Sequence, residues 1–450
     1  MNRKNEFEAM IEELNQPAPG LETTLDRAYQ KRRKKTVNVA VRSVGGLAAC
    51  FAVFVLLVNF CVPVAYACSR VPVLRELAEA VTFSRSLSDA VENEYVQPME
   101  LSQTQNGITA EIAYLIVDQK QVNVFFRLDS DKYEQLEAHP DVRLPCGIVN
   151  NSFGAENGEL RSFTVDFVDE DVPDSMTVYL RVYEDEIREE AFPIEVPDDI
   201  YRDNPVVEPE FLAEFEFLLE FDPEFTETGK VIPVNQTVLL DGQSITITDI
   251  EIYPSHLRVN IDEAPDNTAW IDMLYFYIET DWGMKFETGS GIIATGSEHS
   301  KSMVSYRTDS PFFYEAKHLK LVITGAKFLR KDMETTYLNL VTGEHGPLPD
   351  GAAFDYATRR GADWVVTFRA PYHEDKPMYQ LFGHKFFDAD GNEYEIHQWS
   401  STYGDPDENG NITYFYDVFP LKNYPYDEVW LSPQFSHYWT AENVIVITVQ

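Results

Sequence analysis

The sequence predicts a mainly β protein: a short cytoplasmic helical tail, one transmembrane helix, then tandem antiparallel β-sandwich-like domains outside the membrane. Three observations predict this class. A basic block directly precedes a long apolar run within residues 31–68. Strands with period-two alternation follow residue 108. Residues 1–70 hold 10 basic and 6 acidic residues, a net charge of +4, and the remaining 26 basic and 69 acidic residues give 71–450 a net charge of −43.

The apolar run predicts a transmembrane helix over residues 37–68 rather than a cleaved secretion signal. The 25 residues from Ser43 to Ala67 carry no charge. As a helix they would measure about 38 Å, longer than the bilayer core of roughly 30 Å. A secretory apolar segment is shorter and starts nearer the N-terminus. The sequence Ala65-Tyr66-Ala67 leaves cleavage after Ala67 open as an alternative.

The basic block predicts the orientation of this helix. It consists of Lys31, Arg32, Arg33, Lys34 and Lys35. Basic residues beside a span remain on the cytoplasmic side. We therefore expect a single-pass protein of the cell membrane, with residues 1–36 in the cytoplasm and everything after the span outside.

The cytoplasmic tail carries four apolar residues at helical spacing: Phe7, Met10, Ile11 and Leu14. A helix this short is not stable by itself in water. Two interpretations stand. The tail is ordered only on the membrane surface, or these four residues dock in the groove of a cytoplasmic partner.

Beyond the span, residues 69–98 predict a helical juxtamembrane segment, followed by β-domains over 99–222, 226–345 and 350–450. The strand pair "ITAEIAYLIVDQKQVNVFFRLD" returns as "ITITDIEIYPSHLRVNID" at an offset of 137 positions, which predicts a duplicated β-domain. A third copy is indicated because a strand, a Pro-containing loop and a strand recur three times, beginning at residues 163, 303 and 412. Short strands with Pro, Gly and Asp loops favour antiparallel sandwiches.

Charge and cysteine content exclude some classes of protein. The acidic part repels phosphate backbones, so we expect no nucleic-acid partner. It predicts a solvated surface, with attraction for cations or basic wall polymers as the alternative. The four cysteines are too few for a disulfide framework, because two lie in the apolar run. The exported part must rely on hydrophobic cores.

One loop resembles the first half of a calcium-binding loop. Asp405, Asp407 and Asn409 stand at its first, third and fifth positions, with Gly410 at the sixth. The bidentate Glu of the twelfth position is absent, and Tyr416 stands there. Asn-Gly between two strands also predicts a plain hairpin turn. Both interpretations stay open, and we expect no cofactor other than a calcium ion at this loop.

Catalytic motifs are absent from the sequence. It contains no HExxH, GxSxG, P-loop or Cys/His metal spacing. Acidic pairs are so numerous that no pair stands out. We therefore expect a protein that is not an enzyme.

Two stretches carry a resemblance to known families. The segments "PGLETTLDRAYQKRRKK" and "PVLRELAEAV…SLSDAVENEYVQPMELSQTQNGITAEIAYLIVDQKQVNVFFRL" resemble Gram-positive bacterial membrane proteins of domain of unknown function 4179, often encoded beside extracytoplasmic-function sigma factors. The stretch "VNQTVLLDGQSITITDIEIYPSHLRVNI" is similar to the β-domain that often follows. The resemblance implies an anti-sigma-like regulatory role and brings no catalytic residues. This tail is about half as long as a typical anti-sigma domain.

Two functions are therefore expected. The first is a sensor or regulator whose tail binds a sigma factor and whose β-domains sense an unknown ligand outside. The second is a surface binding or adhesion module that grips a wall polymer or protein, with a tail that serves only to orient the chain in the bilayer.

Overall fold

The computed structural model describes residues 71–144, 146–150, 156–168, 170–184, 211–226, 228–289, 292–296, 302–372, 379–408 and 410–449. The chain divides into two compact units, Met1–Glu76 and Leu77–Gln450. The predicted tail and span lie outside the described residues. No helix within the described ranges is long and apolar enough to cross a membrane. The fold is mainly β, built from antiparallel sheets, as predicted.

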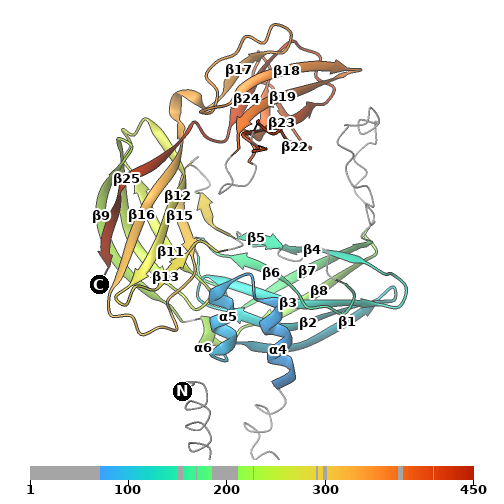
Figure 1. Ribbon diagram of the computed structural model, residues 1–450. Helices are drawn as coiled ribbons and strands as arrows, with labels where there is room; N and C mark the ends of the chain where they lie inside the picture. Colours follow the sequence, from blue (N-terminus) through green and yellow to red (C-terminus); the bar gives the residue numbers. More distant parts are fainter. Residues whose placement is uncertain are drawn as a thin grey trace, which may run out of the picture. The chain divides into compact units, whose positions relative to one another are not determined.

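Two helices of the predicted juxtamembrane segment precede the first strand (Figure 1). They are α4 (Val71–Ala80) and α5 (Arg85–Glu92). The side chain of Ser84 caps α5 by accepting a hydrogen bond from the backbone N–H of Leu87, a common way to satisfy a free helical donor. Leu87 and Val91 of α5 are buried.

The first sandwich, which we call repeat 1, packs a five-stranded sheet on a three-stranded sheet. The sheet orders are β1-β2-β3-β6-β5 and β4-β7-β8, and every pairing is antiparallel. The strands are β1 (Gln97–Gln105), β2 (Ile108–Val117), β3 (Gln121–Ser130), β4 (Leu136–Val142), β5 (Gly147–Asn150), β6 (Arg161–Asp166), β7 (Ser175–Glu184) and β8 (Ala213–Glu220).

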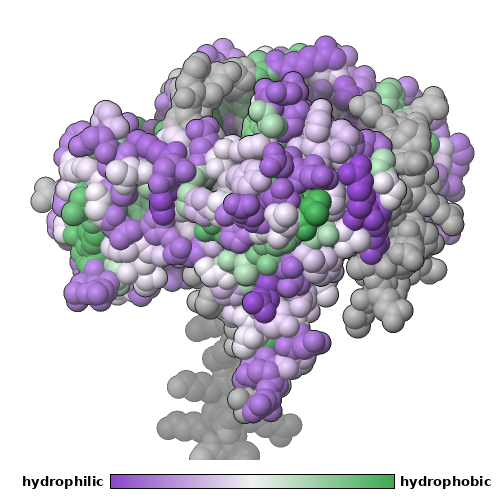
Figure 2. Space-filling view, turned by 90° about the horizontal axis from the view of Figure 1, so that it is seen from above, coloured by the Kyte–Doolittle hydropathy of each residue, from purple (hydrophilic) through white to green (hydrophobic). Residues whose placement is uncertain are grey.

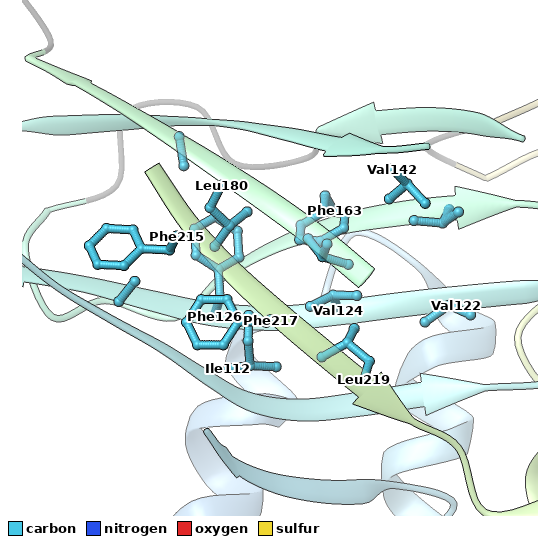
Figure 3. Packing of buried hydrophobic residues seen from close by; sticks show 14 of the residues in the cluster. Ile112, Val122, Val124, Phe126, Val142, Phe163, Leu180, Phe215, Phe217 and Leu219 are labelled. Atoms are coloured by element: carbon cyan, nitrogen blue, oxygen red, sulfur yellow. The ribbon is translucent and has the colours of Figure 1, made fainter. Parts of the chain in front are cut away.

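Alternating apolar residues from both sheets meet inside repeat 1. Figure 3 shows Phe126 and Phe163 of one sheet facing Leu180, Phe215 and Phe217 of the other. The rings of Phe126 and Phe163 lie 5.8 Å apart. Burying such side chains contributes about 1.5–3 kcal/mol each. The core therefore holds this sandwich together without a disulfide.

The second sandwich, repeat 2, pairs sheets of order β14-β15-β11-β10-β9 and β13-β12-β16-β25. The short helix α6 (Pro223–Thr226) precedes it. Its strands are β9 (Lys230–Leu240), β10 (Gln243–Ile252), β11 (Leu257–Glu263), β12 (Ala269–Thr280), β13 (Lys285–Glu287), β14 (Ala294–Gly296), β15 (Met303–Thr308), β16 (Leu319–Arg330) and β25 (His437–Val449).

Repeats 1 and 2 share their strand register. Across a bulge, Ile112 of β2 pairs with Phe126 and Tyr114 with Phe125. In β10 and β11 the pairs are 247 with 261 and 249 with 260, so every residue lies 135 positions after its counterpart. The predicted duplication is present, but the predicted offset of 137 is wrong. A shift of two residues keeps each side chain on the same face, so alternation alone cannot separate the two offsets.

The first hairpins of the two repeats share a turn as well. Asn106 and Gly107 have φ of 55° and 81°, and Asp241 and Gly242 have φ of 48° and 77°. Two left-handed residues form the type I′ turn that suits the twist of paired strands. Again the offset is 135.

The third sandwich interrupts repeat 2, because its strands lie between β16 and β25 along the chain. The sheet orders are β17-β24-β20-β21 and β18-β19-β23-β22, and the second order follows that of β2-β3-β6-β5. A short 3₁₀ turn, η1 (Lys331–Met333), leads into it. The strands are β17 (Thr336–Asn339), β18 (Ala353–Arg360), β19 (Asp363–Pro371), β20 (Phe382–Phe387), β21 (Glu393–Glu395), β22 (Ser400–Tyr403), β23 (Tyr414–Leu421) and β24 (Glu428–Pro433).

This insertion differs from the predicted division at residue 350. The last strand, β25, pairs with β16 along residues 319–328, so it belongs to repeat 2 and not to a domain 350–450. In turn β17, which the prediction placed in 226–345, pairs with β24 of the third sandwich. Without β25, β16 would leave a row of unpaired backbone groups at the edge of its sheet.

Candidate functional site

The β2–β3 turn of repeat 1 meets the β10–β11 turn of repeat 2. Asp118 Oδ1 accepts the backbone N–H groups of Lys120 at 3.0 Å and Gln121 at 2.9 Å. Its other oxygen, Oδ2, accepts the N–H of Ser255 at 3.1 Å and also the hydroxyl of Ser255. Asp118 is fully buried. Burial alone would raise the pKa of Asp118, but the interactions with His256, Ser255 and the Lys120 N–H outweigh it and lower that pKa.

His256 links this turn to an arginine. Its Nε2 accepts a hydrogen bond from Arg258 Nε at 2.8 Å, so Nδ1 carries the proton of a neutral ring. Nδ1 lies 2.8 Å from Ser255 Oγ, which in turn donates to Asp118. Burial lowers the pKa of His256, and the neighbouring Arg258 adds to this, while Asp118 opposes it.

The Asp118, Ser255 and His256 cluster does not have the geometry of a catalytic triad. In a triad the carboxylate and the serine occupy opposite nitrogens of the histidine. Here both lie on the Nδ1 side, and Arg258 takes Nε2. The cluster can hold two turns together, and Arg258 occupies the imidazole nitrogen that a triad would need for catalysis.

A second buried cluster lies beside the first. Asp166 of β6 accepts hydrogen bonds from two arginines of repeat 2. Arg258 Nη2 lies 2.9 Å from Asp166 Oδ1, Arg307 Nε lies 3.2 Å from the same oxygen, and Arg307 Nη2 contacts Oδ2. These three side chains are at most 3% exposed. Burial lowers the pKa of Arg307 to about 10, although Asp166 acts to raise it.

Helix α5 is attached at the same junction. Asp309, which directly follows β15, accepts the backbone N–H and the hydroxyl of Ser86, each at 3.1 Å. The Ser86 hydroxyl also accepts the N–H of Ser310 at 2.7 Å. Arg85 donates to the Lys285 carbonyl at 3.2 Å, and its guanidinium lies 4.4 Å from the centre of the Phe286 ring.

One tyrosine of repeat 2, Tyr314, forms hydrogen bonds with both Arg85 and Asp89 of α5. Tyr314 accepts a hydrogen bond from Arg85 Nη2 at 3.1 Å and donates to Asp89 Oδ1 at 3.0 Å. Burial raises the pKa of Asp89, while Tyr314 and Arg85 lower it. We call the contacts of residues 85, 86 and 89 with repeat 2 the α5 clasp. A polar helix face is thereby held by charge-assisted hydrogen bonds.

A cavity of about 40 Å³ lies between α5 and the two repeats. The volume is large enough for one or more water molecules. Polar side chains of both repeats line it together with apolar ones of α5 and the segment before β14. They are Phe83, Ser84, Leu87, Gln121, Asn123, Thr164, Ser255, His256, Ile292, Ile293, Arg307, Thr308 and Asp309, with Gly289.

The site residues predicted from sequence lie elsewhere. Phe7, Met10, Ile11 and Leu14, and the basic residues 31–35, are outside the described residues. So is Asn409 of the predicted calcium loop. Asp407 Oδ1 accepts the N–H of Asn411 at 2.8 Å, and Gly410, at φ 85°, completes a hairpin turn. The described part of the chain contains no group of three His, Cys, Asp or Glu side chains able to hold a metal ion.

Sequence reasoning did not identify the junction residues. Their signal is a charge inside a largely apolar strand, as at Asp166 in "FTVDFV" and Arg258 in "HLRVNI", whereas Arg307 stands in the polar stretch "SYRTDS". Buried charges are rare unless paired. Such interruptions could have indicated partners, although not which ones.

Two family models match the chain. Residues 31–130 match the "Domain of unknown function (DUF4179)" and residues 229–347 match the "Family of unknown function (DUF5643)". The first match confirms the resemblance predicted from the sequence. None of the curated proteins matches.

Two solved structures show distant similarity to the chain. A conserved domain protein from Bacillus anthracis is 14% identical, with a TM-score of 0.39 over 56% of this chain and 84% of that one. A marsupial T cell receptor is 10% identical, with a TM-score of 0.15 over 79% of this chain and 99% of that one.

Proposed function

We propose that the chain is a single-pass membrane regulator whose β-domains respond to an extracytoplasmic ligand and whose tail acts on a sigma factor in the cytoplasm. The proposal starts from the DUF4179 match, because this family resemblance implies a link to extracytoplasmic-function sigma factors. The uncharged run 43–67 supports the anchor. The junction of the two repeats is the proposed sensing element, and no catalysis is assigned to it.

The observation that carries the proposal is the α5 clasp. Helix α5 begins at Arg85, soon after the proposed span ends at residue 68. It is held by Asp309 and Tyr314 of repeat 2 at the point where both repeats meet. Helix α5 leads directly into β1 of repeat 1 while its polar contacts are with repeat 2, so a change that separates the repeats would strain these contacts. This coupling gives a signal outside a physical route toward the membrane.

The clasp can be tested in the intact cell with a reporter driven by the sigma factor encoded beside the chain. The variant Ser86→Ala with Asp309→Asn removes the hydrogen bond between these side chains and the negative charge that accepts the Ser86 backbone N–H, so we expect a changed reporter output at unchanged surface display. Asp355→Asn, at an exposed aspartate of the third sandwich, is the matched control. Deleting residues 1–30 should remove the response altogether. If neither the Ser86→Ala, Asp309→Asn variant nor the deletion of residues 1–30 changes the reporter output, the proposed regulatory function is refuted.

A specific observation favours the alternative, a surface binding module. The β18-β19-β23-β22 sheet carries aromatic residues that can contact a partner. Tyr356 is 53% exposed, the rings of Tyr414 and Tyr416 meet edge to face at 5.4 Å, and Arg369 lies 5.5 Å from the Tyr414 ring centre. Tyrosine and arginine are enriched at binding surfaces.

The two functions differ in what they require of the tail. If the chain is only a binding module, replacing residues 1–30 by an unrelated basic linker should preserve its phenotype. If it is a regulator, the same replacement should abolish the reporter response while antibody labelling of intact cells stays normal.

A further inference from the structure

The outer face of the β18-β19-β23-β22 sheet carries tyrosines and an arginine. In β19, Phe368 points into the core of the third sandwich, so Thr367 and Arg369 on either side of it point outward. Tyr356 of β18 lies directly opposite Thr367, and Tyr416 of β23 lies directly opposite Arg369. Residues that oppose each other in an antiparallel pair share a face. Tyr356, Tyr416 and Arg369 therefore stand on one outer surface, which we call the tyrosine face.

The tyrosine face is open to solvent. Tyr356 is 53% exposed, Arg369 is exposed and Tyr416 is half-buried. The strands β18 and β23 are the two neighbours of β19, so Tyr356 and Tyr416 stand two strands apart, about 10 Å across the sheet. Tyr414, on the same strand as Tyr416, extends the aromatic surface. A ligand that contacts both Tyr356 and Tyr416 must therefore be extended rather than compact.

Hydrogen-bonding groups of both charges border the tyrosine face. The guanidinium of Arg369 lies against the Tyr414 ring and forms no ion pair with a carboxylate in the part of the chain that the structure describes. A hydrogen bond with Tyr414 raises the pKa of Tyr416, and the negative charge of Asp405 adds to this. Asp405, which is exposed in the loop between β22 and β23, therefore lies near the Tyr416 hydroxyl. The face thus offers hydrogen-bond donors and acceptors together.

These charges disfavour ionic ligands. A polyanion would meet Asp405 and a chain of net charge −39, and a polycation would meet Arg369 between the two tyrosines. Neutral sugar hydroxyls avoid both costs, because they can accept a hydrogen bond from Arg369 and donate one to Asp405. The C–H groups on the face of a pyranose ring also fit the negative π surface of a tyrosine ring. Several such rings joined in a chain can reach both Tyr356 and Tyr416.

We propose that the tyrosine face binds a neutral polysaccharide. One sugar ring lies on Tyr356 and another on Tyr416, while Arg369 donates to sugar oxygens between them and Asp405 accepts from a hydroxyl. The inference rests on the second proposed function, the surface binding module, and names the class of polymer that the module binds.

The test is calorimetric titration of the full chain in lipid nanodiscs, at physiological ionic strength, with two neutral tetrasaccharides. These are cellotetraose and tetra-N-acetylchitotetraose, and we expect at least one of them to bind. Tetragalacturonate has the same number of rings and a carboxylate on each, so it should bind about tenfold more weakly than the better neutral ligand. The monosaccharide of the better ligand should also bind about tenfold more weakly, because one ring cannot stack on both tyrosines.

Tyr356→Ala is the decisive variant. It removes an exposed ring that is not part of the core, so folding should be preserved, and affinity for the better tetrasaccharide should fall about tenfold. Tyr356→Phe keeps the ring and should retain affinity within about twofold. Arg369→Gln should lower affinity about fivefold. Tyr426→Ala is the matched control, because Tyr426 is 46% exposed in the same sandwich but lies beside Asn339 and Asp388, away from the tyrosine face.

Absence of binding for both neutral tetrasaccharides, or equal affinity in Tyr356→Ala and the unaltered chain, would overturn the inference and leave the tyrosine face to a protein partner. These outcomes are separable from failure of the proposed function. If the chain binds a tetrasaccharide through Tyr356 but Tyr356→Ala leaves the phenotype of intact cells unchanged, the sugar site stands and the binding module fails as the function of the chain.

Discussion

Repeats 1 and 2 use one strand register and fill the same buried positions with opposite chemistry. In repeat 1, Asn123 of β3 pairs with Thr164 of β6, and the two side chains share a hydrogen bond of 2.9 Å. In repeat 2 the corresponding pair is Arg258 of β11 and Arg307 of β15. A neutral pair that satisfies itself is thus replaced by two adjacent positive charges that repel one another.

The difference shows why the two repeats are not independent units. Two buried cations need a carboxylate, and Asp166 of repeat 1 supplies it. The arginine pair of repeat 2 therefore depends on a carboxylate of repeat 1, whereas the corresponding pair of repeat 1, Asn123 and Thr164, needs no carboxylate from repeat 2. The two repeats share the register, and the arginine pair in place of a neutral pair gives the dependence.

The largest expected effect comes from removing this carboxylate. Asp166→Asn leaves two buried guanidinium groups without a counterion, and we expect the free energy of unfolding to fall by about 3–5 kcal/mol. Urea denaturation followed by tryptophan fluorescence measures the loss. Asp309→Asn, at the position of repeat 2 that corresponds to Asp166, is the control and should cost less, because Asp309 is only partly buried.

The comparison itself predicts a rescue of this variant. Introducing the repeat 1 pair into repeat 2, as Arg258→Asn with Arg307→Thr, removes both charges. In the Asp166→Asn background these changes should restore at least half of the lost stability. If the triple variant is no more stable than Asp166→Asn alone, charge compensation is not the reason for the contact.

The third sandwich should respond to pH in the opposite direction from the junction. Asp417 is fully buried, and its Oδ2 accepts a hydrogen bond from the Leu381 N–H at 3.0 Å. Burial raises the pKa of Asp417 to about 6, while that N–H acts to lower it. A raised folded pKa penalises the ionised form, so stability is highest below pH 3.8 and falls as the pH rises to about 6. Asp417→Asn should stabilise this sandwich at pH 7 by about 3 kcal/mol and leave stability at pH 3.5 unchanged.

The junction should weaken on acidification. Burial lowers the pKa of His256 below its usual 6.5, so the folded state resists protonation that the unfolded state accepts. Stability is complete above pH 6.5 and declines as the pH falls, by up to about 2 kcal/mol at pH 5. His256→Gln should flatten this dependence. Hydrogen exchange of the β10 and β11 amides at pH 5 and pH 7 measures the stability of the junction separately from that of the third sandwich. Equal protection of these amides at both pH values in the unaltered chain would contradict the prediction.

Much of this architecture could be predicted from the sequence. The alternation of apolar and polar residues in "ITAEIAYLIV" predicted a strand, because side chains of a strand point to opposite faces in turn. The similar spacing of two strand pairs predicted the duplication. The sequence could not predict that β25 belongs to repeat 2 and β17 to the third sandwich. Pairing between strands about a hundred residues apart leaves no local pattern. The junction was missed for the same reason. The partners Asp166 and Arg307 are 141 residues apart, and only the fold brings them together.

The smallest effect tests the equivalence of the repeats directly. Gly107 and Gly242 occupy corresponding turn positions with φ of 81° and 77°, and a Cβ atom at either would meet nothing within 4 Å. Strain in the left-handed region is then the only cost of alanine, so Gly107→Ala and Gly242→Ala should each destabilise by about 1 kcal/mol. Asn tolerates this region, and Gly→Asn at both sites should cost less. Chemical denaturation gives both values. If the two alanine variants differ by more than about 1 kcal/mol, the turns do not correspond as the shared register requires.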